Sequence, residues 1–356
     1  MTTASPYTGW NHRRPVVQHM APDQKIWMIS DLHLGDGTPS DAFFGKDAHL
    51  VALLQRIQAE GSQLVIVGDA IDFHQAWTLR RILAAHPDLF RALADLAAAD
   101  RVTYVIGNHD DELAIYETIL RFKVCDELWI GDDIRVVHGW QFDPVLRSQV
   151  GVSYAWGTTI HHVVERLLGT WIRVPLGEFY TASNRFAFWM GHKVWWLWRN
   201  ARRLLGRDPA PVDARIDYWT WGNLGDSMGM FRPTMAALDE GPHRVLVCGH
   251  SHMPGIVARG DRTYVNTGTW TFASSHVVTL ENGTFTCSDW VSGRRFGDEL
   301  YRTLLEGTIW DTNFERWWQE NYLGWFRFRE GEERRGRPRA WELWIRDAQR
   351  PAGPWG

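Results

Sequence analysis

The segment Lys25-Ile-Trp-Met-Ile-Ser-Asp-Leu-His33 decides the fold of this chain. Its first six residues, with the apolar run Ile26-Trp-Met-Ile29 at their centre, are typical of a buried strand, and the polar residues Asp31 and His33 follow at once. The same arrangement recurs further along the chain, where apolar runs end in short clusters of Asp, Asn, His and Gly. Because these runs alternate with amphipathic stretches, we predict an α/β (or α+β) fold with helices packed on a sheet.

Hydrophobic periodicity predicts the individual elements. Leucine and isoleucine at helical spacing indicate a helix near 47–60, and an alanine- and leucine-rich stretch indicates helix around 79–99. Further apolar runs predict strands at 64–67, 102–106, 134–137, 244–248 and 263–266. Two last strands, 277–280 and 284–286, flank Asn282-Gly283, which is a strong signal for a tight hairpin turn.

Strand character stops after residue 150 and resumes near residue 241. We therefore predict one domain interrupted by an insertion. The expected boundaries are 1–22 for an N-terminal extension, 23–150 and 241–295 for the main domain, 151–240 for a mostly helical lid insertion rich in Trp and Arg, and 296–356 for a tryptophan-rich C-terminal extension.

Composition narrows the class of protein. With 45% hydrophobic and 22% charged residues, the 356-residue chain can bury a real core. Its three cysteines are too few for a disulfide framework or a thiolate zinc site, so we expect a cytoplasmic setting. Residues 1–20 lack the apolar run of a secretory signal, and no stretch reaches the ~20 apolar residues that span a bilayer. A net charge of −4 argues against nucleic acid as a partner.

Five polar clusters at strand ends carry the chemistry. They are Asp31-Leu-His33, Gly68-Asp69-Ala-Ile-Asp72, Gly107-Asn108-His109-Asp110, His138-Gly139 and Gly249-His250-Ser-His252. An ordinary turn explains any one of them alone, but not the ordered set. Because strand ends converge on one edge of an α/β sheet, these side chains are expected to meet there. Carboxylate, imidazole and amide ligands without thiolate suit Mn, Fe(II), Zn or Co.

All five clusters, in this order, resemble the motifs of the calcineurin-like metallophosphoesterases. The resemblance covers roughly half of the chain and implies a sandwich of two β-sheets, flanked by helices, with a two-metal centre. By this resemblance Asp31, His33 and His252 bind one metal, Asn108, His138 and His250 bind the other, and Asp69 bridges both.

Such a centre implies a dinuclear, metal-dependent phosphoester hydrolase. Two ions about 3.5–4 Å apart share a carboxylate and a water, and the bridging hydroxide attacks phosphorus in line. Mn is the expected metal, with Fe, Zn or Co as alternatives. By resemblance His109 contacts a phosphate oxygen or protonates the leaving group, and Asp110 orients its ring. Asp72 is expected to accept hydrogen bonds behind the ligands, and Asn266 is a candidate support for the His252 loop.

Two segments of the sequence indicate a class of substrate. Ser30-Asp-Leu-His-Leu-Gly35 and His138-Gly-Trp-Gln-Phe-Asp143 look most like the UDP-2,3-diacylglucosamine pyrophosphatase branch of this family. That branch has Arg at the place of His109 and Asp at the place of Trp140. The resemblance implies a pyrophosphatase or phosphodiesterase acting on a nucleotide-linked or amphiphilic substrate. A soluble phosphodiesterase or phosphatase acting on small nucleotides, and a non-catalytic binding scaffold, remain as alternatives.

The insertion holds part of an excess of tryptophan, which amounts to 22 residues in the chain. Residues 185–207 include six Arg or Lys, four Trp and no acidic residue. This composition fits an interfacial helix that meets anionic headgroups at the inner face of a membrane, and it equally fits a lid packed over the metal site. The expected substrate-binding residues are Trp195, Trp196, Trp198 and Arg199.

Overall fold

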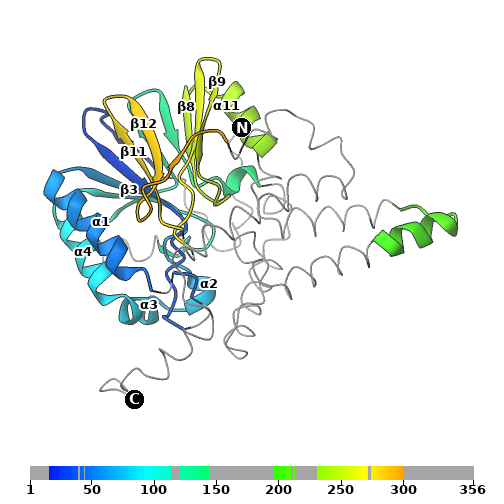
Figure 1. Cartoon of the computed structure of the whole chain (residues 1–356), viewed down its shortest axis with the longest axis horizontal. Coiled ribbons are helices and arrows are strands. Elements are labelled where there is room, and N and C mark those ends of the chain that lie inside the picture. Colours follow the sequence, from blue (N-terminus) through cyan, green and yellow to red (C-terminus); the bar gives the residue numbers. More distant parts are fainter. Residues whose placement is uncertain are drawn as a thin grey trace.

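The computed structural model of the chain contains two β-sheets with helices beside them (Figure 1). It describes residues 16–38, 41–43, 45–113, 121–143, 194, 196–209, 212, 231–271, 274–299 and 301. Most of the expected insertion at 151–240 and of the expected C-terminal extension at 296–356 therefore lies outside the described residues.

The seven-stranded sheet has the order β13-β12-β11-β2-β3-β4-β5. Its strands are β2 (Ile26–Ile29), β3 (Gln63–Val67), β4 (Val102–Val105), β5 (Lys123–Cys125), β11 (His276–Glu281), β12 (Thr284–Asp289) and β13 (Arg295–Phe296). The neighbours from β2 to β5 pair in parallel, whereas β11 pairs antiparallel with both β2 and β12. The carboxyl ends of β2, β3 and β4 consequently lie at one edge.

The six-stranded sheet has the order β1-β6-β7-β8-β10-β9. Its strands are β1 (Val17–Met20), β6 (Glu127–Ile130), β7 (Ile134–Val136), β8 (Val245–Cys248), β9 (Gly255–Arg259) and β10 (Arg262–Asn266). Strand β8 pairs in parallel with both β7 and β10. The carboxyl ends of β7 and β8 therefore also lie together.

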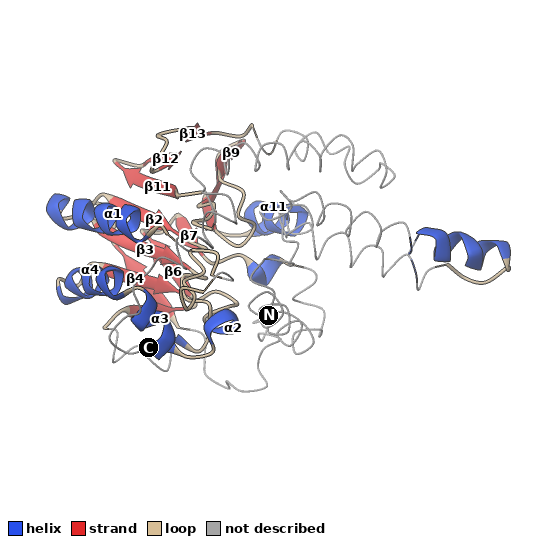
Figure 2. Ribbon diagram, turned by 60° about the horizontal axis from the view of Figure 1, so that its bottom comes forward, coloured by secondary structure: helices blue, strands red, loops and turns tan. Residues whose placement is uncertain are grey.

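The labelled helices among the described residues are α1 (Asp47–Glu60), α2 (Phe73–Ala76), α3 (Leu79–Ala85), α4 (Pro87–Ala98), the 3-10 helix η1 (Trp140–Phe142) and α11 (Phe231–Glu240), and residues 196–204 are also helical. Figure 2 shows α1 and α4 along one face of the seven-stranded sheet. The expected helical stretch at 79–99 is divided at His86, where α3 ends and Pro87 takes the first position of α4. Proline suits that position because its missing N–H has no helical partner there.

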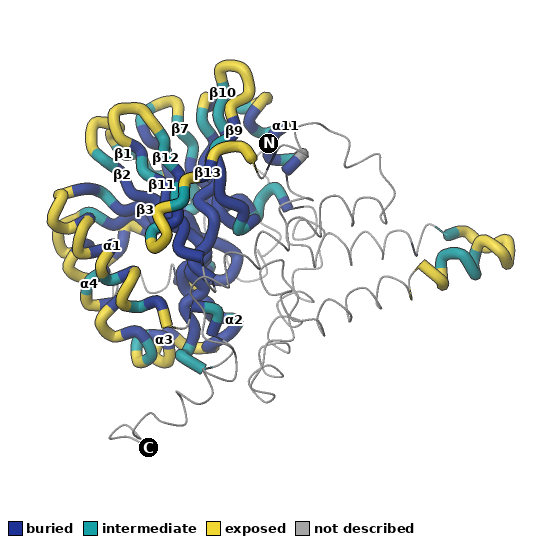
Figure 3. The backbone as a smooth tube through the Cα atoms, in the orientation of Figure 1, coloured by how far each residue is buried: buried dark blue, intermediate teal, exposed yellow. Residues whose placement is uncertain are grey.

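Strand alternation divides the core into two layers. In β2, Trp27 and Ile29 pack in the cluster that contains the buried leucines of α1, such as Leu50 and Leu53. The intervening Ile26 and Met28 belong to a second cluster with residues of the six-stranded sheet. Successive side chains of a strand point to opposite faces, so the second cluster fills the space between the sheets. In Figure 3 the buried colour runs through both sheets and into the loops at their ends.

The expected fold class is confirmed, with particular differences. Residues 17–20, assigned from the sequence to an N-terminal extension, form β1 and pair in parallel with β6. The hairpin turn is confirmed, because Asn282 and Gly283 both have positive φ, 51° and 75°. Among the described residues no helix is both long and apolar enough to cross a bilayer.

Candidate metal centre

The five polar clusters meet at the ends of strands from both sheets. Loops after β2, β3 and β4 contribute Asp31, His33, Asp69 and Asn108, and loops after β7 and β8 contribute His138, His250 and His252. The expectation of a single sheet edge was therefore incomplete. The loops are joined by backbone hydrogen bonds, including Asp31 N to Gly68 O at 3.0 Å and Gly249 N to His138 O at 2.8 Å.

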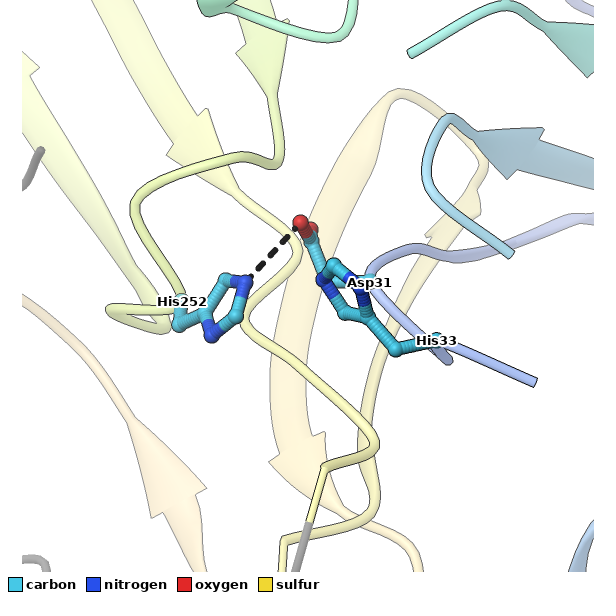
Figure 4. Close-up of side chains that lie close together, drawn as sticks. All are labelled: Asp31, His33 and His252. Atoms are coloured by element: carbon cyan, nitrogen blue, oxygen red, sulfur yellow. Dashed lines mark ion pairs between the residues drawn. The ribbon is translucent and has the colours of Figure 1, made fainter. Parts of the chain in front are cut away.

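Asp31, His33 and His252 form the first donor group. One ligand atom from each lies within 4.8 Å of the others. Figure 4 shows their side chains together, with Asp31 Oδ1 lying 3.2 Å from Nε2 of His252. Nδ1 of His33 lies 3.1 Å from Asp72 Oδ2, and its buried Nε2 has no hydrogen-bond partner. That nitrogen is thus left as a donor for a cation.

Asp69, His138 and His250 form the second donor group, again within 4.8 Å. Nδ1 of His138 donates to the carbonyl of Val67 at 2.7 Å, which leaves Nε2, 3.2 Å from Asp69 Oδ2, as the ligand atom. Both amide atoms of Asn108 are buried without hydrogen-bond partners. Asp69 also groups with His33 and His109, so its carboxylate lies between the two donor groups.

The backbone of the centre is held in an uncommon conformation. Five expected ligands have positive φ between 48° and 63°: Asp31, His33, Asp69, His250 and His252. Non-glycine residues rarely adopt this region, and clusters of them mark functional sites. Glycine is needed where the loops approach most closely, because a Cβ at Gly107 would overlap the Asp69 carboxylate.

Opposite charges stabilise the buried carboxylates. Burial raises the pKa of Asp69, but the charge and hydrogen bond of His138 outweigh burial and hold that pKa well below its ordinary value. Burial likewise raises the pKa of Asp31, but His252 and His138 outweigh burial and lower it. Burial lowers the pKa of His138, yet Asp69 and Asp31 raise it to about 10. Two anionic carboxylates therefore face the centre at neutral pH.

His109 lies against this centre, but its neighbour differs from the expected one. Nδ1 of His109 lies 3.2 Å from Asp72 Oδ1, so Asp72 and not Asp110 orients the ring. Asp110 instead accepts hydrogen bonds from Gly107 N at 2.7 Å and Ala70 N at 2.9 Å. The Asp110 side chain is held by these backbone groups of its own loop and of the loop after β3, so it does not orient His109. Burial, with His74 adding to it, lowers the pKa of His109 to about 3.

Three residues near the ligands had no role assigned from the sequence. His74 has its ring 4.5 Å from that of His109, and Asp72, His74 and His109 offer donor atoms within 4.8 Å. Asp143 Oδ2 lies 3.1 Å from Nε2 of His250. The hydroxyl of Tyr104 donates to Asp110. The only sequence signals were the short spacings Asp72-x-His74 and His138 to Asp143.

Asn266 was a candidate support for the loop that carries His252. Its Nδ2 donates to Gly249 O at 2.8 Å and lies 2.9 Å from the Ser251 hydroxyl. Both partners are in the loop between β8 and β9, which also contains His250 and His252. Asn266 therefore fixes the position of both ligands of that loop.

The expected substrate-binding residues lie elsewhere. Trp196, Trp198 and Arg199 belong to a helical segment that Figures 1 and 2 draw apart from both sheets. Trp195 lies outside the described residues. The structure does not bring these side chains to the donor groups.

The residues present fit a pair of divalent cations. The buried and unpartnered His33 Nε2 and Asn108 Oδ1 are donor atoms without a protein partner, next to two anionic carboxylates. Such atoms are costly to bury unless a cation or water satisfies them. The nitrogen and oxygen donor set suits Mn, Fe, Co or Zn.

The chain is similar to known proteins over part of its length. Over 94 residues the chain is 34% identical to UDP-2,3-diacylglucosamine hydrolases of Bordetella parapertussis and Bordetella bronchiseptica, a match covering 25% of this chain. It spans only 33% of the length of those relatives.

Solved structures of phosphoesterases also match. Yfce, a phosphoesterase from E. coli, is 15% identical, with a TM-score of 0.37 and coverage of 76% of this chain and 96% of that one. A dimetal phosphatase from Danio rerio is 14% identical, with a TM-score of 0.38 and coverage of 75% and 96%. The family model of the calcineurin-like phosphoesterases matches residues 24–254, which include all five clusters, and the chain belongs to that family.

Proposed function

We propose that this member of a family of metal-dependent phosphoester hydrolases cleaves a phosphodiester or pyrophosphate bond in a nucleotide-linked or amphiphilic substrate. One observation carries the catalytic part. Asp69 forms one donor group with His138 and His250 and another with His33 and His109, and His33 also belongs to the group with Asp31 and His252. Asn108 is proposed as a further ligand because both of its amide atoms are buried without a hydrogen-bond partner. A carboxylate placed between two donor groups suits two cations that share a ligand.

In this proposal each donor group holds one divalent cation, and Asp69 serves both. Bound cations would supply Lewis acidity toward the phosphoryl oxygens and a water of lowered pKa as nucleophile. The protein fixes the donors: the Val67 carbonyl selects the tautomer of His138, and Asp72 does the same for His33. Mn is the proposed metal, with Fe, Zn or Co as alternatives, because imidazole, carboxylate and amide donors without thiolate suit all four.

His109 is proposed to assist at the leaving group or at a phosphoryl oxygen. Its ring is neutral at pH 7 in this structure, because burial and His74 lower its pKa. An anionic phosphoryl group beside the ring raises that pKa. In the protonated form the ring would pair with Asp72 through Nδ1 and present its other N–H to the substrate. Asp110, by contrast, is proposed to hold the loop that carries Asn108 and His109.

The substrate class is proposed on two grounds. The partial match to UDP-2,3-diacylglucosamine hydrolases covers 94 residues, and those relatives are described as acting on a nucleotide-linked, acylated sugar. The helical segment with Trp196 and Trp198 exposes apolar surface, which suits an enzyme that meets amphiphilic molecules or a membrane surface.

Metal analysis followed by a substrate panel tests the proposal. Purified protein reconstituted with Mn²⁺ is expected to hold close to two ions per chain. Chelation is expected to abolish hydrolysis of bis-p-nitrophenyl phosphate, and added Mn²⁺ to restore it. An acylated UDP-sugar is expected to give a higher kcat/KM than p-nitrophenyl phosphate. Activity that survives complete removal of metal would overturn the catalytic assignment, and preference for small nucleotides would overturn only the substrate class.

A further inference from the structure

The segment at 194–207 places apolar side chains in solvent. Leu204 is 88% exposed, Leu205 69%, Leu197 60%, Val194 55% and Trp198 51%. Across the described part of the chain, six of the ten large apolar side chains that are exposed lie in this segment. A concentration of this kind marks an interaction surface, whereas scattered exposed residues need no explanation.

Five of these six side chains share one face of a helix, and the sixth, Trp196, falls on the other side among the arginines. Residues 196–204 are helical, and positions 194, 197, 198, 201, 204 and 205 follow the spacing of three and four residues that aligns a single face. Arg199, Arg202 and Arg203 fall on the remaining circumference. The segment is thus an amphipathic helix with an arginine-rich polar face and an apolar face exposed to water.

The end of this helix is a defined structure. Gly206 has φ of 64°, Gly206 N donates to Arg203 O at 3.0 Å, and Arg207 N donates to Arg202 O at 2.8 Å. This pattern is a Schellman motif, the usual glycine-terminated end of a helix. Arg202 Nε also donates to Asp208 O at 2.7 Å, which fixes the chain beyond the turn. Leu204 and Leu205 are therefore held exposed in the last turn.

We propose that residues 194–207 dock onto a bilayer that contains anionic lipids. The apolar face would enter the boundary between headgroups and acyl chains, and the arginines would pair with lipid phosphates. This inference rests on the proposed function in one respect: it gives the membrane surface as the place where the protein meets an amphiphilic substrate. The docking itself can be measured without catalysis.

Charge favours a lipid surface over a second copy of the chain. Residues 194–207 contain four arginines and no acidic residue, although the whole chain carries a net charge of −4. An anionic surface therefore attracts this segment and repels the rest of the molecule, which orients the protein. Self-association through the same face would bring the arginines of two copies together.

Cosedimentation with vesicles tests the inference on the full chain. Binding is expected to vesicles of phosphatidylcholine mixed with phosphatidylglycerol, and to be much weaker with phosphatidylcholine alone. The double change Leu204→Ser and Leu205→Ser is expected to weaken binding by about tenfold or more, because it removes the apolar contact. Val291→Ser is the matched control, since Val291 is 55% exposed in a different part of the chain.

The arginines are tested separately. Arg203→Gln with Arg207→Gln is expected to reduce binding to the anionic vesicles and to reduce its dependence on salt. Arg91→Gln with Arg244→Gln is the control, because both side chains are well exposed, at 72% and 62%. Equal binding by the apolar double variant and the parent chain would overturn the inference.

A site-specific label shows whether the tip enters the bilayer. All three native cysteines are buried, so Leu204→Cys can be labelled selectively with an environment-sensitive dye. A blue shift on addition of anionic vesicles is expected, with none for a dye at Val291→Cys. A concentration-dependent shift without vesicles, accompanied by a dimeric mass, would assign the face to self-association and overturn lipid docking. Vesicle binding by a protein that hydrolyses no phosphoester would leave docking intact while the proposed function fails.

Discussion

Asp72 Oδ1 lies 3.2 Å from Nδ1 of His109, so a carboxylate three residues after the proposed bridging ligand holds the proposed acid. The other oxygen of Asp72 lies 3.1 Å from Nδ1 of His33, a proposed metal ligand. Both oxygens are buried, and Oδ1 also accepts from Gln75 N at 3.0 Å, where Asp72 caps α2. One carboxylate therefore couples the orientation of a ligand to the orientation of the acid.

Asp72→Asn is expected to weaken both functions of this carboxylate. An amide is the right shape to cap α2 but has no charge and only one acceptor oxygen, so it cannot serve both imidazoles. We expect Mn²⁺ affinity to fall by about 10–100-fold, as for other residues that orient metal ligands, together with a loss of turnover. Metal titration and steady-state kinetics measure the two effects. Asp88→Asn, in an exposed ion pair with Arg91, is the control. Unchanged affinity and rate would show that Asp72 only caps the helix.

His109→Gln is expected to retain the metal content and to lower turnover by roughly 10²–10⁴. The loss should depend on the leaving group if His109 is a proton donor. It should be largest for alkyl esters and small for p-nitrophenyl esters, whose leaving group needs no proton. A uniform loss across leaving groups would assign His109 to a phosphoryl oxygen instead. Loss of metal in this variant would make His109 a ligand, contrary to our assignment.

Asp69→Asn is expected to be the most damaging change of a ligand. A neutral amide cannot balance the charge of two cations, and it removes the carboxylate oxygen that lies 3.2 Å from Nε2 of His138. We expect at most one metal per chain and no measurable hydrolysis. Elemental analysis and a diesterase assay check this, with Asp100→Asn, an exposed position, as the comparison. Two bound ions in Asp69→Asn would show that this carboxylate does not bridge.

His86 is expected to make folding stability depend on pH. Burial lowers the pKa of His86, but Asp41 and Asp47 more than offset this and raise it to about 9. The folded-state pKa exceeds the unfolded value of about 6.5. The contribution of His86 to folding stability is therefore complete below pH ~6.5 and disappears as pH rises toward 9. We therefore expect the free energy of unfolding, measured with denaturant, to be lower for His86→Gln than for the parent by up to about 3 kcal/mol at pH 6 and by much less above pH 9. A difference that is constant with pH would contradict this.

The sequence predicted the elements whose patterns are long or sharp. Helix α1 has the expected bounds, since four buried residues at helical spacing mark it and Gly61, with φ of 72°, ends it. Strands β1, β5, β6, β9 and β13 were not predicted, because they are short and lack the continuous buried apolar run that marks β2 and β4. The positions of β1 and β5 depend on pairing with β6 and β4, which local sequence does not encode.

The sequence predicted which residues belong to the candidate site better than it predicted which of them contact one another. The clusters at strand ends bring six of the expected ligands into donor groups that Asp69 and His33 connect, and the assignment of each ligand to one of two metals stays a prediction. The family resemblance implied Asp110 as the partner of His109, whereas in the structure Asp72 lies beside the ring and Asp110 accepts from Gly107 N. His74 approaches His109 only through the short helix α2, whose position depends on backbone contact between Phe73 and His109.

The left-handed backbone at Asp31, His33, Asp69, His250 and His252 implies a conflict between thermal robustness and catalysis. Each such residue costs on the order of 1 kcal/mol that glycine would not. Selection for heat resistance alone, without selection for turnover, would therefore drive these positions toward glycine. A laboratory lineage evolved in that way should gain melting temperature while it loses its hydrolytic centre one ligand at a time.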